Sequence, residues 1–176
     1  EADSYADAYV NTAPEGTASN AIHITSDVDI SVYGAHIAGS TSDAFVAIPT
    51  PSLGTNYRLL SHPATIASYP GRFSLIAVEE GTTDVTITPS VELAGGQSAG
   101  TGYSVSLEQG EGYTSRSVGT VGADISGTLI AGDKKLVVTS GVDCVNVLAG
   151  ACDHIVQYMP PTVTWGKSGI LPGSIN

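Results

Sequence analysis

Residues 73–88 read FSLIAVEEGTTDVTIT, a sequence that predicts two β-strands. The first part, Phe73–Val78, is a nearly continuous apolar run, which is typical of a strand near the middle of a sheet. The last part, Val85–Thr88, alternates apolar and polar residues, which is typical of a strand with one face in water. Glu80–Asp84 lies between them and contains Gly81, so we expect it to form a hairpin loop that joins the two strands.

The same alternation recurs along the chain, and no window predicts a convincing amphipathic helix. Further alternating segments are Ile22–Thr25, Val28–Tyr33 and Tyr103–Glu108. Leu136–Val138 is another continuous apolar run, and turn residues at Gly132-Asp133 precede it. We therefore expect an all-β protein with almost no helix: an antiparallel β-sandwich built from two related β-units packed together.

The composition excludes several classes of protein. The chain has 176 residues, of which 41% are hydrophobic, so it can bury a core. It carries 17 acidic and 6 basic residues, a net charge of -11, and the basic residues are scattered. Nucleic acids and anionic membranes require clustered positive charge, so we expect neither as a partner. No apolar run approaches the ~20 residues that span a bilayer, so we expect no membrane span.

A weak internal repeat relates the two ends of the chain. The segments Ile30–Gly34 and Asp43–Pro49 resemble Leu136–Gly141 and Asp153–Pro160, in the same order. Chance similarity between β-hairpins is the alternative explanation. If the repeat is real, the expected division is a partial first β-unit, a second β-unit and a C-terminal tail or linker, at residues 1–54, 55–166 and 167–176. The first unit would then lack its upstream strands and would need strands from other polypeptide or from the second unit.

The two cysteines, Cys144 and Cys152, have seven residues between them, unlike the two-residue gap of a zinc knuckle or redox motif. We expect a disulfide in the second unit, and two free buried thiols are the alternative. A closed loop of this size would contribute ~2.5 kcal/mol of stability in the chain-entropy model. A disulfide would indicate an oxidising compartment.

Ser140, Asp143 and His154 supply the residue types of a Ser-His-Asp hydrolase. However, no Gly-x-Ser-x-Gly elbow is present, and the adjacent Asp153 and His154 would point to opposite faces of a strand. We therefore expect no catalytic residues and no enzymatic activity. The expected role of Asp153 or His154 is a hydrogen bond to loop backbone beside the disulfide.

Calcium is the one cofactor for which candidate ligands exist. Asp27 with Asp29, or Asp143 with Asp153, could share a loop rim with backbone carbonyls. No Asp-x-Asp-x-Asp-Gly loop is present, and the alternative is that these acids are solvated and keep the surface soluble. The other histidines, His23, His36 and His62, are isolated in the sequence, so no zinc site is expected.

Several segments together resemble the N-terminal domain of the IgGFc-binding protein family. They are IHITSDVDISVYG (22–34), DAFVAIPTPSLGTNYRLLS (43–61), FSLIAVEEGTTDVTITP (73–89), YSVSLEQGEGYT (103–114), GTLIAGDKKLVVTSG (127–141) and CVNVLAGACDHIVQYMPPTVTWG (144–166). The resemblance covers the C-terminal two-thirds of that domain, which extends upstream by several strands. Its most specific residues are structural ones, namely Cys144, Cys152, Asp153, His154, Pro160, Pro161, Trp165 and Gly166. The chain departs from the family at Lys134-Lys135, where Lys-Pro is usual, so this strand edge is expected to be open.

The resemblance implies a secreted protein at the cell surface or in the extracellular space, although no signal peptide is visible in this chain. We expect a non-catalytic module for adhesion, matrix building or recognition, whose partner is a protein or a glycan. The alternative is a structural subunit of an extracellular filament or sheath, which binds copies of itself by β-strand complementation. The resemblance transfers no binding residue.

Overall fold

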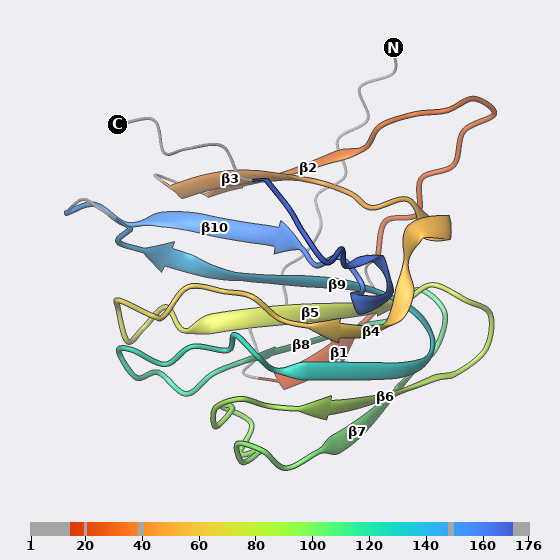
Figure 1. Ribbon diagram of the computed structural model, residues 1–176. Helices are drawn as coiled ribbons and strands as arrows, with labels where there is room; N and C mark the ends of the chain where they lie inside the picture. Colours follow the sequence, from red (N-terminus) through yellow and green to blue (C-terminus); the bar gives the residue numbers. More distant parts are fainter. Residues whose placement is uncertain (1–14, 20, 39–40, 148–149, 171–176) are drawn as a thin grey trace.

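The computed structural model describes residues 15–19, 21–38, 41–147 and 150–170, and these form ten strands and two short 3-10 turns (Figure 1). The strands are β1 (Glu15–Ala18), β2 (Tyr33–Ala38), β3 (Thr41–Val46), β4 (Gly54–Arg58), β5 (Gly71–Ala77), β6 (Thr83–Thr88), β7 (Tyr103–Leu107), β8 (Gly112–Arg116), β9 (Leu129–Val145) and β10 (Asp153–Tyr158). The turns are η1 (Thr50–Ser52) and η2 (Thr162–Thr164). All strand pairs are antiparallel, so the predicted all-β fold class is confirmed.

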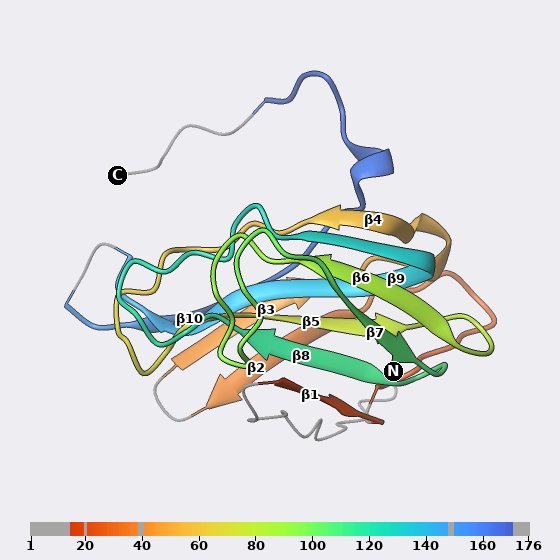
Figure 2. The ribbon, with the colours of Figure 1, turned by 90° about the horizontal axis from the view of Figure 1, so that it is seen from below.

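The 17-residue strand β9 organises the fold. Residues 129–136 pair with β4 and β6, whereas residues 136–145 pair with β5 and β10. Beyond these, β7 pairs with β6, and β8 joins β5 to the edge strand β1. The result is one eight-stranded, strongly curved sheet whose two halves face each other as layers (Figure 2).

The core lies between these two layers. Phe73 and Leu75 face it from β5, Val85 and Ile87 from β6, and all four are essentially inaccessible to solvent. Buried and less buried residues alternate along both strands, as the sequence predicts. The remaining buried side chains of the cluster are Tyr57, Leu59, Ala77, Leu93, Leu107, Tyr113, Ile125, Ile130, Leu136, Val138 and Met159.

The expected hairpin between Phe73–Val78 and Val85–Thr88 is wrong. Both strands exist, but β5 pairs with β8 and β9, and β6 pairs with β7 and β9. The loop 78–82 therefore connects the two layers and does not close a ladder. The apolar run in β5 requires a neighbour at each edge, and β8 and β9 supply them from elsewhere in the chain.

The expected turn at Gly132-Asp133 is also wrong, because β9 continues through it with a bend. Residues 133–135 pair with neither β5 nor β6. Their side chains instead form hydrogen bonds with the backbone of β6, of the loop before it and of η1. The Asp133 carboxylate accepts a hydrogen bond from the Asp84 N–H at 2.9 Å, and the Lys134 ammonium donates to the Glu80 carbonyl at 2.7 Å. The Lys135 ammonium donates to the Pro51 carbonyl at 3.3 Å.

Residues 21–32 contradict the sequence prediction most clearly. Ile22–Thr25 and Val28–Tyr33 alternate like strands, yet β2 begins only at Tyr33, and no strand of the described chain pairs with 21–32. Their side chains are largely exposed. Alternation shows that a segment can form a strand, but a strand also needs a partner edge.

The proposed division at residue 54 stays a prediction. Residues from both sides of it share one sheet, because β1 pairs with β8 along Glu15–Ala18. The hairpin β2–β3 is separate from that sheet in its backbone pairing. It pairs within itself, from Tyr33 opposite Val46 to Ala38 opposite Thr41.

The substitution Tyr57→Phe tests the junction between β4 and β9. The buried Tyr57 hydroxyl donates to the Leu136 carbonyl at 2.6 Å and accepts from the Gly54 N–H at 3.0 Å. Its removal leaves two buried backbone groups without this partner, so we expect the free energy of unfolding in urea to fall by about 1–3 kcal/mol. The control is Tyr33→Phe, since Tyr33 is 71% exposed. Equal losses in the two variants would contradict the assignment.

Candidate binding site

The hairpin β2–β3 has two chemically different faces. The inner face, directed towards the main sheet, carries Gly34, His36, Asp43 and Phe45, which are all partly buried. Gly34 lies opposite Phe45, and a Cβ atom at residue 34 would overlap the Phe45 ring. The absence of a side chain at Gly34 therefore allows this ring to lie across β2.

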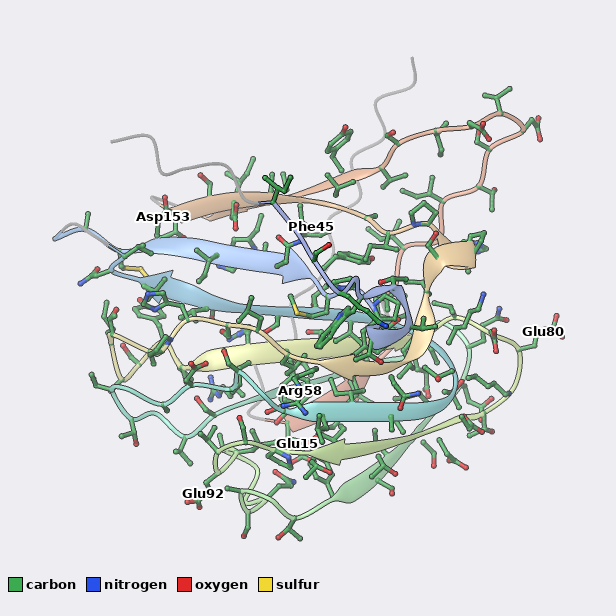
Figure 3. All side chains as sticks on the ribbon, in the orientation of Figure 1. Glu15, Phe45, Arg58, Glu80, Glu92 and Asp153 are labelled. Atoms are coloured by element: carbon green, nitrogen blue, oxygen red, sulfur yellow. A yellow bond between two sulfur atoms is a disulfide. The ribbon has the colours of Figure 1, made fainter. Side chains whose placement is uncertain are left out.

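Two carboxylates join β3 to β10 through hydrogen bonds to backbone N–H groups. Asp43 accepts a hydrogen bond from the Val156 N–H at 2.7 Å. Asp153 accepts from the Ser42 N–H and from its neighbour His154 N–H, both at 2.9 Å. The Ser42 bond, and then the His154 bond, lower the pKa of Asp153. Figure 3 marks Phe45 and Asp153 along this junction.

Two ring pairs complete the contact between the hairpin and β10. The imidazoles of His36 and His154 are stacked, with their centroids 4.0 Å apart and 22° between their planes. Phe45 lies against Tyr158, with ring centroids 5.3 Å apart. The register between β10 and β9 shifts between Asp153 and Ile155, so His154 lies at an irregularity of this pairing, and its side chain is buried.

An ion pair lies next to the stacked imidazoles. Arg72 on β5 contacts the Asp143 carboxylate on β9 at 2.6 Å. The Nδ1 atom of His154 is 3.4 Å from the Asp143 carbonyl oxygen and 4.0 Å from its carboxylate. Asp143 thus uses its carboxylate mainly for Arg72 and its backbone for His154.

These groups surround a half-open cavity of about 150 Å³ between the hairpin and the sheet. It is lined by His36, Phe45, Arg72, Phe73, Ser74, Thr139, Ser140, Gly141, Asp143, His154, Ile155 and Val156. Successive residues of a strand point to opposite faces, so Arg72 and Ser74 share the face of β5 that is opposite to core residue Phe73.

The residues of the hypothetical hydrolase do not form a triad here. Ser140 and Asp143 are three positions apart on β9, which directs them to opposite faces of the strand. The Ser140 hydroxyl is buried without a hydrogen-bond partner in the described chain, and the Asp143 carboxylate binds Arg72. The geometry gives His154 neither a serine to activate nor a carboxylate within hydrogen-bond distance of its ring.

The calcium candidates lie in two different environments. Asp27 and Asp29 lie in the exposed segment 21–32, and Asp143 and Asp153 bind different partners. Among the residues that the structure describes, no group of three or more His, Cys, Asp or Glu side chains could hold a metal ion. Calcium binding stays a prediction.

The disulfide prediction is confirmed. Cys144 at the end of β9 is bonded to Cys152, just before β10, with their Cα atoms 5.1 Å apart. The bond closes the connection between the two strands directly before Asp153 and His154. It therefore fixes the end of β10 that carries the carboxylate and the imidazole of the site.

The other motif residues lie beyond β10. Pro161 is buried, and a Cβ atom at Gly54 would be 2.6 Å from its ring, so the two residues pack closely. Trp165 is 53% exposed and its indole N–H donates to the Pro160 carbonyl at 3.4 Å. Gly166 is exposed. Their role in a structural motif stays a prediction.

The sequence points to His154, Asp143 and Asp153 as candidate site residues. It does not point to Arg72, Asp43 or Phe45. One available signal was the internal repeat, which aligns Asp43 with Asp153. In the structure each of these carboxylates binds backbone of the other strand. No comparable signal pointed to Arg72, because its partner lies on a strand distant in the sequence.

Comparison with known proteins identifies the family. The family model described as IgGFc binding protein matches residues 43–175, which include most of β3, Arg72, the disulfide and β10. The chain belongs to the IgGFc-binding protein family. Human IgGFc-binding protein is 29% identical over 155 residues, which cover 87% of this chain and only 3% of the human protein. No solved structure matches this family member. Its described residues include no helix long and apolar enough to cross a membrane.

Acidification tests the contact between the hairpin and β10. Burial, and then the His36 ring, lower the pKa of His154 below 6.5, against smaller opposing effects of Asp143 and Asp43. When the pKa of a histidine is lower in the folded state than in the unfolded state, its contribution to the free energy of unfolding is complete above pH 6.5. This contribution is lost as the pH falls. We expect the Ser42 and Val156 amides to exchange faster with solvent, relative to core amides, at about pH 5.5 than at about pH 7.5.

The variant His154→Phe keeps a ring in place and removes the titrating group, so it should lose most of this pH dependence. The control His23→Gln alters an exposed histidine and should retain it. Hydrogen exchange, corrected at each pH for the intrinsic rate, is the measurement. An unchanged pH dependence in His154→Phe would contradict the assignment.

Proposed function

We propose that this domain is a non-catalytic extracellular module that binds a protein partner through the exposed side of residues 22–46. The observation that carries the proposal is the concentration of exposed apolar side chains in this segment. They are Ile22, Ile24, Val28, Ile30, Tyr33, Ile37 and Val46, each at least half exposed. Exposed apolar side chains that form a patch are typical of protein interaction sites.

Within this surface, the outer face of the hairpin is held in a fixed position. Tyr33 lies opposite Val46 in the ladder, and Ile37 lies four residues further along β2 on the same face. The inner face is held against the main sheet by Asp43 and Asp153, so the outer face is presented on a fixed support. A pre-organised surface loses less entropy on binding than a flexible one.

The disulfide and the family support the location and the class of partner. A disulfide in a small domain is typical of secreted proteins. The human relative is named for binding the Fc region of IgG, although this chain matches only 3% of it. The Fc region of IgG is therefore the first partner to test.

A structural subunit assembled by strand complementation is the second candidate. In the described chain β2 pairs only with β3, so its other edge is open, and the alternating segment 21–32 pairs with no strand. Open edges and unpaired alternating segments can accept a strand from another molecule. Size exclusion over a range of concentrations separates this candidate from a monomeric binding module.

The substitution Ile37→Lys tests the proposed surface, with Val163→Lys as the matched control. Both side chains are 81% exposed, but Val163 lies in η2 and outside the hairpin. In surface plasmon resonance against immobilised Fc and Fab fragments, we expect the domain to bind Fc. Ile37→Lys should weaken this binding by about tenfold or more, as for a central interface residue, and Val163→Lys should leave it unchanged. Failure of the unmodified domain to bind Fc, or equal effects of the two variants, would contradict the proposal.

A further inference from the structure

The cavity beneath the hairpin differs chemically from the exposed surface above it. β5 contributes Arg72 and Ser74 to its floor, β9 contributes Thr139 and Asp143, and part of its wall comes from the Phe45 ring. These residues supply a guanidinium, a carboxylate, two hydroxyls and an aromatic ring within one cleft. Small-molecule sites typically combine an aromatic or apolar wall with a few fixed polar groups.

The arginine and the carboxylate that line this cleft neutralise each other. Arg72 and Asp143 form an ion pair at 2.6 Å, so the guanidinium is already neutralised. Burial lowers the pKa of His154, which keeps its imidazole uncharged at neutral pH. An anionic ligand would have to compete with Asp143 for Arg72, and a cationic ligand would compete with Arg72 for Asp143. The cleft therefore favours an uncharged polar ligand.

The hydrogen-bonding groups of the cleft are of mixed type. Arg72 can only donate, a carboxylate can only accept, and the hydroxyl of Thr139 can do both. The Ser74 hydroxyl already shares a hydrogen bond with the Thr114 hydroxyl at 3.0 Å. The Nε atom of Arg72 is buried and has no hydrogen-bond partner in the described chain. A ligand that carries several hydroxyl groups can satisfy donors and acceptors together, because each hydroxyl both donates and accepts.

The size of the cavity sets the size of the ligand. Its volume is about 150 Å³, and an engineered apolar cavity of about 150 Å³ is known to hold one six-membered ring. The cleft is half open, so substituents on such a ring can extend into solvent. A ring that bears hydroxyl groups and has a weakly polar C–H face fits both the polar floor and the Phe45 wall.

We propose that this cavity binds one uncharged pyranose ring, the terminal sugar of a neutral glycan. The Arg72–Asp143 pair binds adjacent hydroxyls of the sugar, Thr139 binds a further hydroxyl, and the C–H face of the ring lies against Phe45. This inference is independent of the proposed Fc binding, because it concerns the inner face of the hairpin and not the outer one.

Saturation-transfer NMR with the intact chain tests the proposal. The probes are the free sugars D-galactose, D-mannose, D-glucose and L-fucose, with N-acetylneuraminic acid as a charged comparison, each at millimolar concentration. We expect saturation transfer to at least one of the neutral sugars and none to the acidic one. Transfer to no sugar, or to the acidic sugar alone, would overturn the proposal.

Matched variants locate the site. Thr139→Val keeps the side-chain shape and removes one hydroxyl, and Arg72→Lys keeps the charge for Asp143 and removes Nε and the planar group. Each should weaken sugar binding by about tenfold, the usual effect of losing a hydrogen bond to a charged or buried group. The control Thr86→Val makes the same change on an exposed face of β6 and should have no effect. Thermal unfolding by circular dichroism selects the variants that are folded. Unchanged sugar binding in folded Thr139→Val would place the sugar elsewhere and overturn the assignment.

Discussion

The structure depends on the central strand β9, which pairs with four other strands. Its second half has buried residues on both faces, because the core covers one side and the hairpin region the other. Gly141 illustrates how close this packing is: it pairs with Arg72 on β5 and Val156 on β10, and a Cβ atom there would overlap the Ile155 backbone. Glycine is the one residue type that this crossing accepts, although glycine is otherwise unfavourable within strands.

The hairpin is attached to β10 by two carboxylates, one on each side of the contact. Asp43 on β3 binds the β10 backbone, and Asp153 on β10 binds the β3 backbone. Hydrogen bonds to ionised acceptors are stronger than those between neutral groups, so two carboxylates can replace part of a ladder. They also fix a gap between hairpin and sheet, since a side chain is longer than a direct backbone hydrogen bond. The cavity lined by Arg72 and Asp143 lies in this gap.

The sequence predicts local structure well wherever a partner strand exists. The alternation in β6 and β7 and the apolar run in β5 correspond to strands within a residue or two. Strand pairing is predicted less well. The loop that contains Gly81 has residues typical of a hairpin turn, yet it connects two layers. The site could be predicted only in part: Cys144, Cys152 and His154 lie close together in the sequence. Arg72 and Phe45 reach the same cleft through strand pairing that no local pattern encodes.

The hairpin orients its residues against the usual rule of burial. Its polar His36 and Asp43 face the protein, and its apolar Tyr33 and Ile37 face solvent. A shift of register or a rotation of the hairpin would bury the apolar set and gain hydrophobic free energy. The observed orientation persists because such a change would break the hydrogen bond between Asp43 and the Val156 N–H. In addition, the Phe45 ring fits only across Gly34. The polar contacts thus oppose the hydrophobic effect at this hairpin. The exposed apolar side chains of the hairpin thereby stay available to the proposed protein partner.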